Sequence, residues 1–208
     1  ELYINCEKGD YNNIKKILDE KDFSSKTLDF AIRRCLRNFK QDYREYFETL
    51  AVLLQYVDIS YKNAAEDNSS ILLLACEIGD ANIVDLIVNN DYSTNLNYPR
   101  KIDISVLDDM NRNAIHYLIN NGVDEDEAWE ILAILMEVNE ESVYSMVNQE
   151  DKNGYTPLSI SLYLGWHKFS KRLIELKGNQ IKVIKPGNNN LIHYAIMGNN
   201  LYCLKLML

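Results

Sequence analysis

Three histidines and four cysteines are the first residues of this chain to consider as metal ligands or nucleophiles. His116, His167 and His193 do not share the spacing of a metal-ligand set. No cysteine has a histidine and a carboxylate around it in the arrangement that thiol catalysis requires. We therefore expect no catalytic residue, no metal site and no enzymatic activity. The scattered cysteines predict small buried thiols in a reducing compartment, and they are Cys6, Cys35, Cys76 and Cys203.

The acidic run at residues 124–127 could in principle bind a cation. It lacks the alternating ligands and the internal glycine of a calcium-binding loop. Because carboxylates favour the positive N-terminal end of a helix, we predict instead that a helix begins here. The sequence contains no phosphate-binding loop and no dinucleotide-binding, kinase or hydrolase motif, so we also expect no cofactor.

Composition argues against further classes of function. The chain has 208 residues, of which 47% are hydrophobic, and this is ample material for a core. No run of about 18 apolar residues is present, so we expect no membrane span. The net charge of −9 argues against a broad basic surface, and we expect no direct binding of nucleic acid.

The elements that position these residues are clearest at residues 151–158, which read Asp-Lys-Asn-Gly-Tyr-Thr-Pro-Leu. Gly154 permits a turn geometry that a Cβ would obstruct. Thr156 is a good N-cap, and Pro157 suits the first position of a helix because its missing N–H would be unpaired there anyway. The octet resembles the opening of an ankyrin repeat, in which a β-turn at the tip of a hairpin precedes a helix.

The same register recurs elsewhere in the chain. Segments anchored at Ser70, Asn113 and Asn190 match the alanine, histidine or glycine positions of the family pattern, and two weaker matches precede them. The resemblance implies an all-α-dominated repeat solenoid of about six ankyrin repeats, each a helix-turn-helix with a β-hairpin or loop. We expect a single domain over residues 1–208, with repeats at approximately 1–20, 21–64, 65–107, 108–150, 151–184 and 185–208.

The repeats are interrupted by insertions. The step from Thr156 to Asn190 is 34 residues, close to the ~33 of the family, whereas three earlier steps are 43 or 44. The additional residues fall at Leu36 to Phe47, Asp91 to Asp103 and Val123 to Glu127. Insertions in a solenoid map to loops and often carry function. The last apolar helix has no polar cap after it, so we expect the chain to be a segment of a longer protein.

The resemblance also implies a binding surface on the concave side, made of the hairpin tips and the exposed end of each first helix. Tyr155, Tyr163 and Leu164 would place aromatic and apolar groups there, as interfaces favour. The alternative is that the tyrosines pack against the adjacent insertions. A basic spot at Arg33 and Arg34 would suit a partner that bears carboxylate or phosphate. By register, the candidate partner-binding residues are Arg33, Arg34, Glu77, Ile78, Arg112, Asn120, Asn121, Lys152, Asn153, Tyr155, Tyr163 and Leu164.

Two classes of function fit these expectations. The first is a non-catalytic protein–protein interaction module or scaffold, which binds a partner protein through the concave surface or the insertions. The second is a regulatory ankyrin domain of a larger transcription factor, channel or enzyme whose activity lies outside this segment. Both classes imply an intracellular protein, cytoplasmic or nuclear. The resemblance further implies that His116 and His193 link backbone groups of adjoining hairpins.

Overall fold

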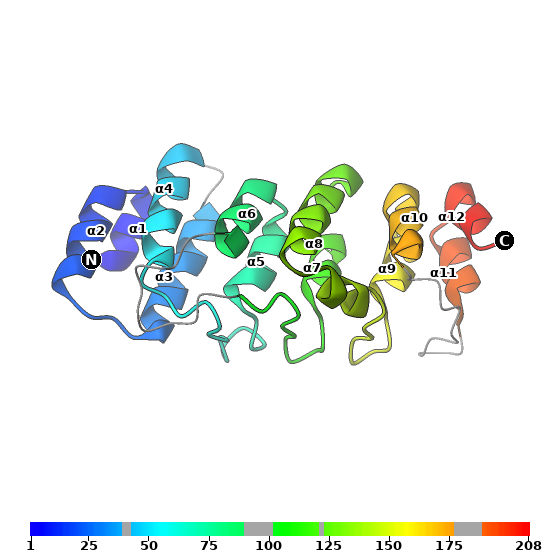
Figure 1. Ribbon diagram of the computed structural model, residues 1–208, viewed down its shortest axis with the longest axis horizontal. Coiled ribbons are helices and arrows are strands. Elements are labelled where there is room, and N and C mark those ends of the chain that lie inside the picture. Colours follow the sequence, from blue (N-terminus) through cyan, green and yellow to red (C-terminus); the bar gives the residue numbers. More distant parts are fainter. Residues whose placement is uncertain (39–42, 90–101, 121–122, 177–188) are drawn as a thin grey trace. The chain divides into compact units, whose positions relative to one another are not determined.

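The computed structural model describes residues 1–38, 43–89, 102–120, 123–176 and 189–208 (Figure 1). Within these ranges the chain forms twelve α-helices that follow one another in pairs. Each pair lies inside one of the six ranges expected from the repeat register. The helices group into two compact units, which are Glu1–Ala75 with Asn82–Asp103 and Cys76–Ala81 with Ile104–Leu208.

The first unit is built on α1 (Leu2–Lys8), α2 (Tyr11–Glu20), α3 (Ser25–Asn38) and α4 (Tyr43–Leu54). α3 packs against both α1 and α4, and α2 packs against the same two helices. Leu28, Ile32 and Leu36 are four residues apart on α3, so they share one face of the helix, and all three are buried. α5 (Ile71–Ile78) begins in this unit, and α6 (Ala81–Asn89) ends in it.

The second unit contains α7 (Ala114–Asn120), α8 (Glu125–Val147), α9 (Pro157–Tyr163), α10 (His167–Glu175), α11 (Leu191–Met197) and α12 (Leu201–Leu206). The first helices of its pairs, α7, α9 and α11, lie side by side, and so do the second helices, α8, α10 and α12. Two layers of helices result. Phe169 and Leu173 of α10 are fully buried between neighbours, because stacking covers the apolar face that a lone repeat would leave exposed.

The start of α9 follows its sequence signals. The Ser159 N–H donates to the Thr156 hydroxyl at 3.2 Å, and the Thr156 N–H donates to the Ser159 hydroxyl at 3.0 Å. This reciprocal capping box satisfies two N–H groups that a helix end leaves unpaired. Pro157 occupies the first turn, and Gly154 just before it has a φ of +83°, as its turn requires.

The acidic run begins α8, as predicted. The Asp124 carboxylate accepts the backbone N–H groups of Asp126 and Glu127, at 2.7 and 3.4 Å. α8 bends at Asn139, whose φ of −162° and ψ of 97° leave the helical region. The Asn139 side chain then accepts the Ser142 N–H at 3.0 Å, so it caps the second half of the helix.

In place of the expected β-hairpins, the described residues form tight turns before α7 and α9, and residues 63–69 carry an isolated antiparallel bridge between Asn63 and Ser69. All four cysteines are buried free thiols. Burial raises the pKa of the Cys6 and Cys76 thiols to about 12, so both stay protonated at neutral pH and serve as small core residues. Among the described residues, no helix is both long enough and apolar enough to cross a membrane.

Candidate functional site

A pocket of about 430 Å³ lies in the second unit beside the turn of residues 151–155. Its walls come from the loop before α7, the turn before α9, α9 itself and α11. Four residues that the sequence places at the binding surface line this pocket together, namely Arg112, Asn153, Tyr155 and Tyr163. The complete lining is Met110, Arg112, Asp151, Asn153, Tyr155, Ser159, Ile160, Tyr163, Asn189, Tyr194 and Met197.

The turn that forms one wall is held by Asp151. The Asp151 carboxylate accepts the backbone N–H groups of Asn153 and Tyr155, both at 2.8 Å. The Asp151 carbonyl accepts the Gly154 N–H at 2.9 Å, and the Asp151 N–H donates to the Tyr155 carbonyl at 2.9 Å. An aspartate side chain that accepts N–H groups farther along its own backbone fixes a turn. This wall of the pocket is therefore shaped by the chain itself.

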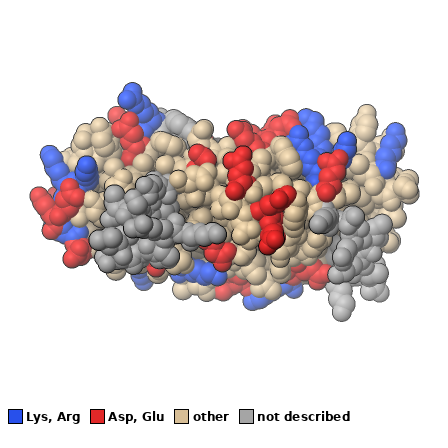
Figure 2. Space-filling model, viewed as in Figure 1, with Lys and Arg blue, Asp and Glu red and all other residues tan. Residues whose placement is uncertain are grey.

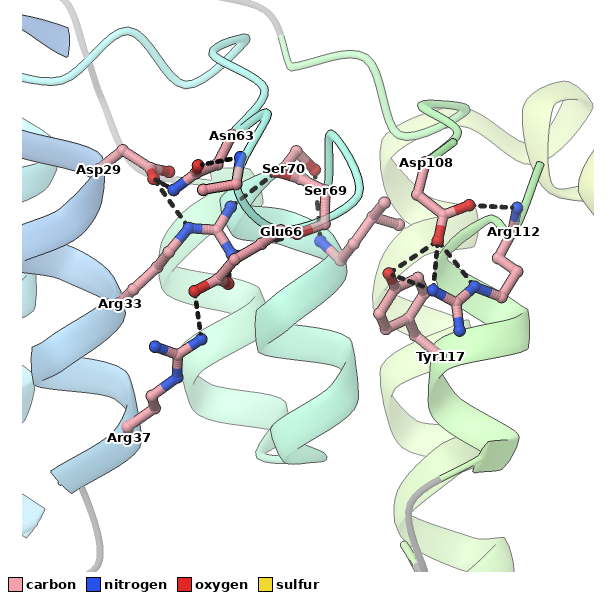
Figure 3. A network of polar contacts seen from close by, with 12 residues as sticks. Asp29, Arg33, Arg37, Asn63, Glu66, Ser69, Ser70, Asp108, Arg112 and Tyr117 are labelled. Carbon is pink, nitrogen blue, oxygen red and sulfur yellow. Dashed lines mark hydrogen bonds and ion pairs between the residues drawn. The ribbon is translucent and has the colours of Figure 1, made fainter. Parts of the chain in front are cut away.

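The turn before α7 repeats this arrangement around Asp108 (Figure 3). The Asp108 carboxylate accepts the backbone N–H groups of Met110 and Arg112 at 2.9 and 2.8 Å. Its second oxygen accepts from Arg112 Nε at 2.7 Å and from the Tyr117 hydroxyl at 2.9 Å. Burial and the hydrogen bond to Asp108 raise the pKa of Tyr117, so the phenol keeps the proton that it donates. Arg112 thus reaches the pocket as a half-buried cation already paired with a carboxylate.

His116 fastens the turn of residues 151–155 to α7. His116 Nδ1 lies 3.2 Å from the Asn113 backbone nitrogen and 2.9 Å from the Asn113 side-chain oxygen. A backbone carbonyl can only accept a hydrogen bond, so Nε2 carries a proton and donates to the Tyr155 carbonyl at 3.1 Å. Burial lowers the pKa of the imidazole. The link between adjoining turns that the ankyrin resemblance implies is present at His116, whereas His193 is exposed and caps its own helix with Asn190.

The lowered pKa of His116 predicts a loss of stability in mild acid. The unfolded chain binds a proton below pH ~6.5 more readily than the fold does, so this contribution is complete above that pH and is lost as the pH falls below it. Urea unfolding between about pH 5 and pH 8 measures the slope. His116→Gln should remove part of the slope, with His193→Gln as the control. Equal slopes in His116→Gln and the wild type would contradict the assignment.

Aromatic and apolar side chains make up much of the remaining pocket lining. Tyr155 meets Tyr194 of α11 edge-on, with ring centroids 5.8 Å apart. Tyr155 is half-buried by this contact, so it both packs and lines the pocket. Tyr163 is 49% exposed, and Met197 of α11 is 55% exposed. Leu164 is 46% exposed but does not line the pocket.

Arg33 corrects the sequence prediction of an exposed basic spot. Its side chain is completely buried in the first unit, where Nε pairs with Asp29 at 2.8 Å. One terminal nitrogen pairs with Glu66 at 2.7 Å, and the other donates to the Ser69 carbonyl at 2.6 Å (Figure 3). Asn63 also donates to Asp29, at 2.7 Å. Arg33 therefore fastens the loop of residues 63–69 to α3 and is not available to a partner.

Arg34 keeps an exposed position in the first unit, next to aromatic side chains. Its guanidinium pairs with Glu7 and lies 5.7 Å from the Tyr3 ring centroid and 5.2 Å from that of Phe30. Arg37, one turn farther along α3, pairs with Glu66 at 2.6 Å. The arginines at the surface of this helix are therefore Arg34 and Arg37, and both guanidinium groups already have carboxylate partners.

The remaining candidates belong to the third, fourth and fifth repeats. Glu77 and Ile78 are half-buried at the end of α5, and Lys152 is exposed. Among these, Glu77, Ile78 and Lys152 do not line the pocket. Asn120 is the last residue of α7, and Asn121 lies outside the described residues, as does most of the insertion Asp91 to Asp103.

The sequence-based candidates did not include Tyr194 and Met197, which line the pocket from α11 beside α9. Met197 lies seven residues past the anchor Asn190, as Tyr163 lies seven past Thr156, so the register extended to the last repeat would have found it. Tyr194 is four residues past the anchor, a position that the register did not assign to the binding surface. The signal that could have found Tyr194 is the stacking order of the repeats, since first helices of successive repeats are adjacent.

The comparisons with known proteins concern the fold. No protein-family model matches the sequence, and no curated protein matches it either. A solved structure does match, the crystal structure of EF0377, an ankyrin repeat protein, with 17% sequence identity. The TM-score is 0.73, and the match covers 99% of this chain and 95% of that chain. The chain therefore has the fold of an ankyrin-repeat protein, an all-α repeat solenoid.

Proposed function

We propose that this chain is a non-catalytic module that binds a partner protein, and that the pocket beside residues 151–155 receives an apolar or aromatic side chain of that partner. Proteins of the ankyrin fold generally mediate protein–protein interaction and are typically not catalytic. The observation that carries the proposal is the pocket itself, which is lined by Tyr155 of the turn, Tyr163 of α9 and Met197 of α11.

The chemistry of the pocket suits a protein anchor. Aromatic residues and methionine are enriched at interfaces, because they supply large apolar contact area with few rotatable bonds or with an adaptable shape. Polar groups at the rim, Asn153 and Arg112 among them, can orient the backbone of a bound segment. The turns held by Asp108 and Asp151 are formed in advance, so binding orders little of the chain and less affinity is lost.

The second candidate is a regulatory domain of a larger protein, in which the same pocket binds a segment of that protein. We place the module in an intracellular compartment, cytoplasmic or nuclear. The four buried free thiols favour a reducing environment. The absence of direct binding to nucleic acid is part of the proposal, and the net charge of −9 supports it.

Tyr163→Glu tests the proposal by affinity capture from native lysate. The wild-type chain should retain a protein that Tyr163→Glu loses, because the new charge would have to be buried at an apolar contact. Ile4→Glu is the matched control, since Ile4 is 53% exposed on the first unit, and it should retain the same protein. Thermal melts should show that both variants remain folded.

Each outcome of the capture has a meaning. Loss of the captured protein in Tyr163→Glu alone supports the pocket as the interface. Equal capture by all three chains would contradict the pocket and point to another surface. If no chain captures a protein, the second candidate, with a partner segment in the same protein, becomes the better account.

A further inference from the structure

A second pocket, of about 520 Å³, lies on the second helices α10 and α12. Four cations line this basic pocket, namely Lys168, Lys171, Arg172 and Lys205, and Glu175 is the single acidic residue in its lining. The chain as a whole has 31 acidic and 22 basic residues, so the charge balance is reversed here. Figure 2 shows Lys and Arg side chains gathered at the upper right, over α10 and α12, with acidic side chains beside them.

Two of the four cations form exposed ion pairs. Lys168 Nζ lies 2.9 Å from an Asp126 oxygen, and Lys171 Nζ lies 3.9 Å from a Glu175 oxygen. The side chains in both pairs are more than half exposed. Exposed pairs of this kind contribute little stability and are screened by salt, so an arriving anion can compete for both lysines.

The other two cations are held by aromatic rings. The Arg172 guanidinium lies 4.4 Å from the Trp129 ring centroid, and Lys205 Nζ lies 5.8 Å from that of Tyr202. A ring orients a cation without neutralising its charge. Within the described part of the chain, no carboxylate forms an ion pair with Arg172 or Lys205. Arg172 is half-buried and Lys205 is exposed, so both charges are accessible to an anion.

An exposed aromatic group completes the basic pocket. Tyr202 is 63% exposed, and its ring lies 5.1 Å from the His167 imidazole. Arginine and an exposed tyrosine are among the residues enriched at protein interfaces. The positive surface is short, because Asp126 and Glu125 of α8 lie beside Lys168 and His167. These carboxylates and the net charge of −9 would repel a long polyanion such as a nucleic acid.

From this charge complementarity we propose that the basic pocket binds a short acidic peptide segment of a partner protein. The carboxylates of the segment would approach Arg172 and Lys205 and displace the exposed partners of Lys168 and Lys171. Its backbone would lie against Tyr202. This site is separate from the pocket at residues 151–155, because the two share no lining residue.

Fluorescence polarisation with a labelled oligoglutamate peptide tests the proposal on the whole chain of residues 1–208. Lys171→Gln combined with Lys205→Gln should weaken binding of this peptide by about tenfold at low salt, because two exposed cations are removed. Lys15→Gln combined with Lys16→Gln is the matched control, since it removes the same charge from exposed positions of α2. The control should bind within about twofold of the wild type.

Three further results decide the matter. Raising NaCl from about 50 to about 200 mM should weaken binding of the peptide to the wild type. The affinity of the variant with Lys171→Gln and Lys205→Gln should change less. The proposal is overturned if the control weakens as much as the pocket variant, or if a single-stranded oligothymidylate of equal length binds more tightly than oligoglutamate. Tyr163→Glu should bind the peptide like the wild type. Failure of the basic-pocket proposal can therefore be told apart from failure of the proposal for the pocket beside residues 151–155.

Discussion

Arg33→Met should lower the free energy of unfolding by about 3–5 kcal/mol, the largest effect we expect from a single substitution. The guanidinium of Arg33 is completely buried and forms an ion pair with the buried Asp29 carboxylate. Methionine has a similar length but no charge, so it would leave Asp29 as an uncompensated buried anion. The Ser69 carbonyl would also lose a charge-assisted hydrogen bond.

Urea unfolding monitored by circular dichroism measures this loss. Arg37→Met is the matched control, because Arg37 is 51% exposed and pairs with the same Glu66. Its cost should stay within about 1 kcal/mol, as for other exposed ion pairs. Adding Asp29→Asn to Arg33→Met should restore part of the stability, since the unpaired charge is then absent. If Arg33→Met and Arg37→Met lower the free energy of unfolding equally, the buried Arg33–Asp29 pair does not stabilise the loop of residues 63–69.

The network around Arg33 also has a dependence on pH. Burial raises the pKa of Glu66, but the hydrogen bonds and charges of Arg37 and Arg33 outweigh burial and lower it overall. A carboxylate with a lowered pKa contributes stability that is present above its unfolded pKa, ~4.3, and is lost as the pH falls through the folded value. This loss begins below pH ~4.3, whereas the one expected from His116 begins below pH ~6.5.

Gly198→Ala should lower the free energy of unfolding by about 1–3 kcal/mol, or more if α9 and α11 cannot separate. A Cβ at position 198 would lie 2.2 Å from the Leu162 carbonyl oxygen and 2.7 Å from that of Tyr163. Both oxygens belong to the backbone at the end of α9, so no side-chain rotation relieves the overlap. The φ of Gly198 is −68°, which alanine adopts freely, so the cost is entirely steric.

The same substitution should affect the binding pocket. Tyr163 and Met197 line it from α9 and α11, which Gly198 allows to approach closely. Pushing these helices apart should weaken capture of the partner as well as stability. Asn199→Gly is the control, because Asn199 is exposed with a φ of +49° that glycine also adopts. It should change stability by no more than about 0.5 kcal/mol. A Gly198→Ala chain as stable as the wild type would show that the helices yield without cost.

Local signals in the sequence were sufficient for the helix starts and for one wall of the candidate site. Gly154, Thr156 and Pro157 act within a few residues of themselves, so their spacing alone predicts the turn and the capped helix. His116 followed from register, because it binds the turn of the next repeat. His193 shares that register but is exposed, and nothing in its own segment distinguishes it from His116.

Arg33 shows where the register argument failed. The arginines at positions 33 and 34 are adjacent on one helix and look alike in the sequence, yet consecutive helical residues point about 100° apart. Only Arg33 meets the loop of residues 63–69, more than 30 residues later in the chain. Its burial depends on where that loop returns, which no local pattern specifies.

The sequence by itself determined the repeat fold, the helix pairs and the turn at residues 151–155, because capping, turn geometry and apolar spacing act over a few neighbouring residues. Only the tertiary structure decided which side chains share a pocket. Tyr163 with Met197, and Arg172 with Lys205, belong to different repeats and meet because stacked helices bring them together. Tertiary packing also decided that the Arg33 side chain is buried, whereas the Arg34 side chain is 39% exposed. Contacts between repeats depend on packing across distances that a one-repeat pattern does not encode.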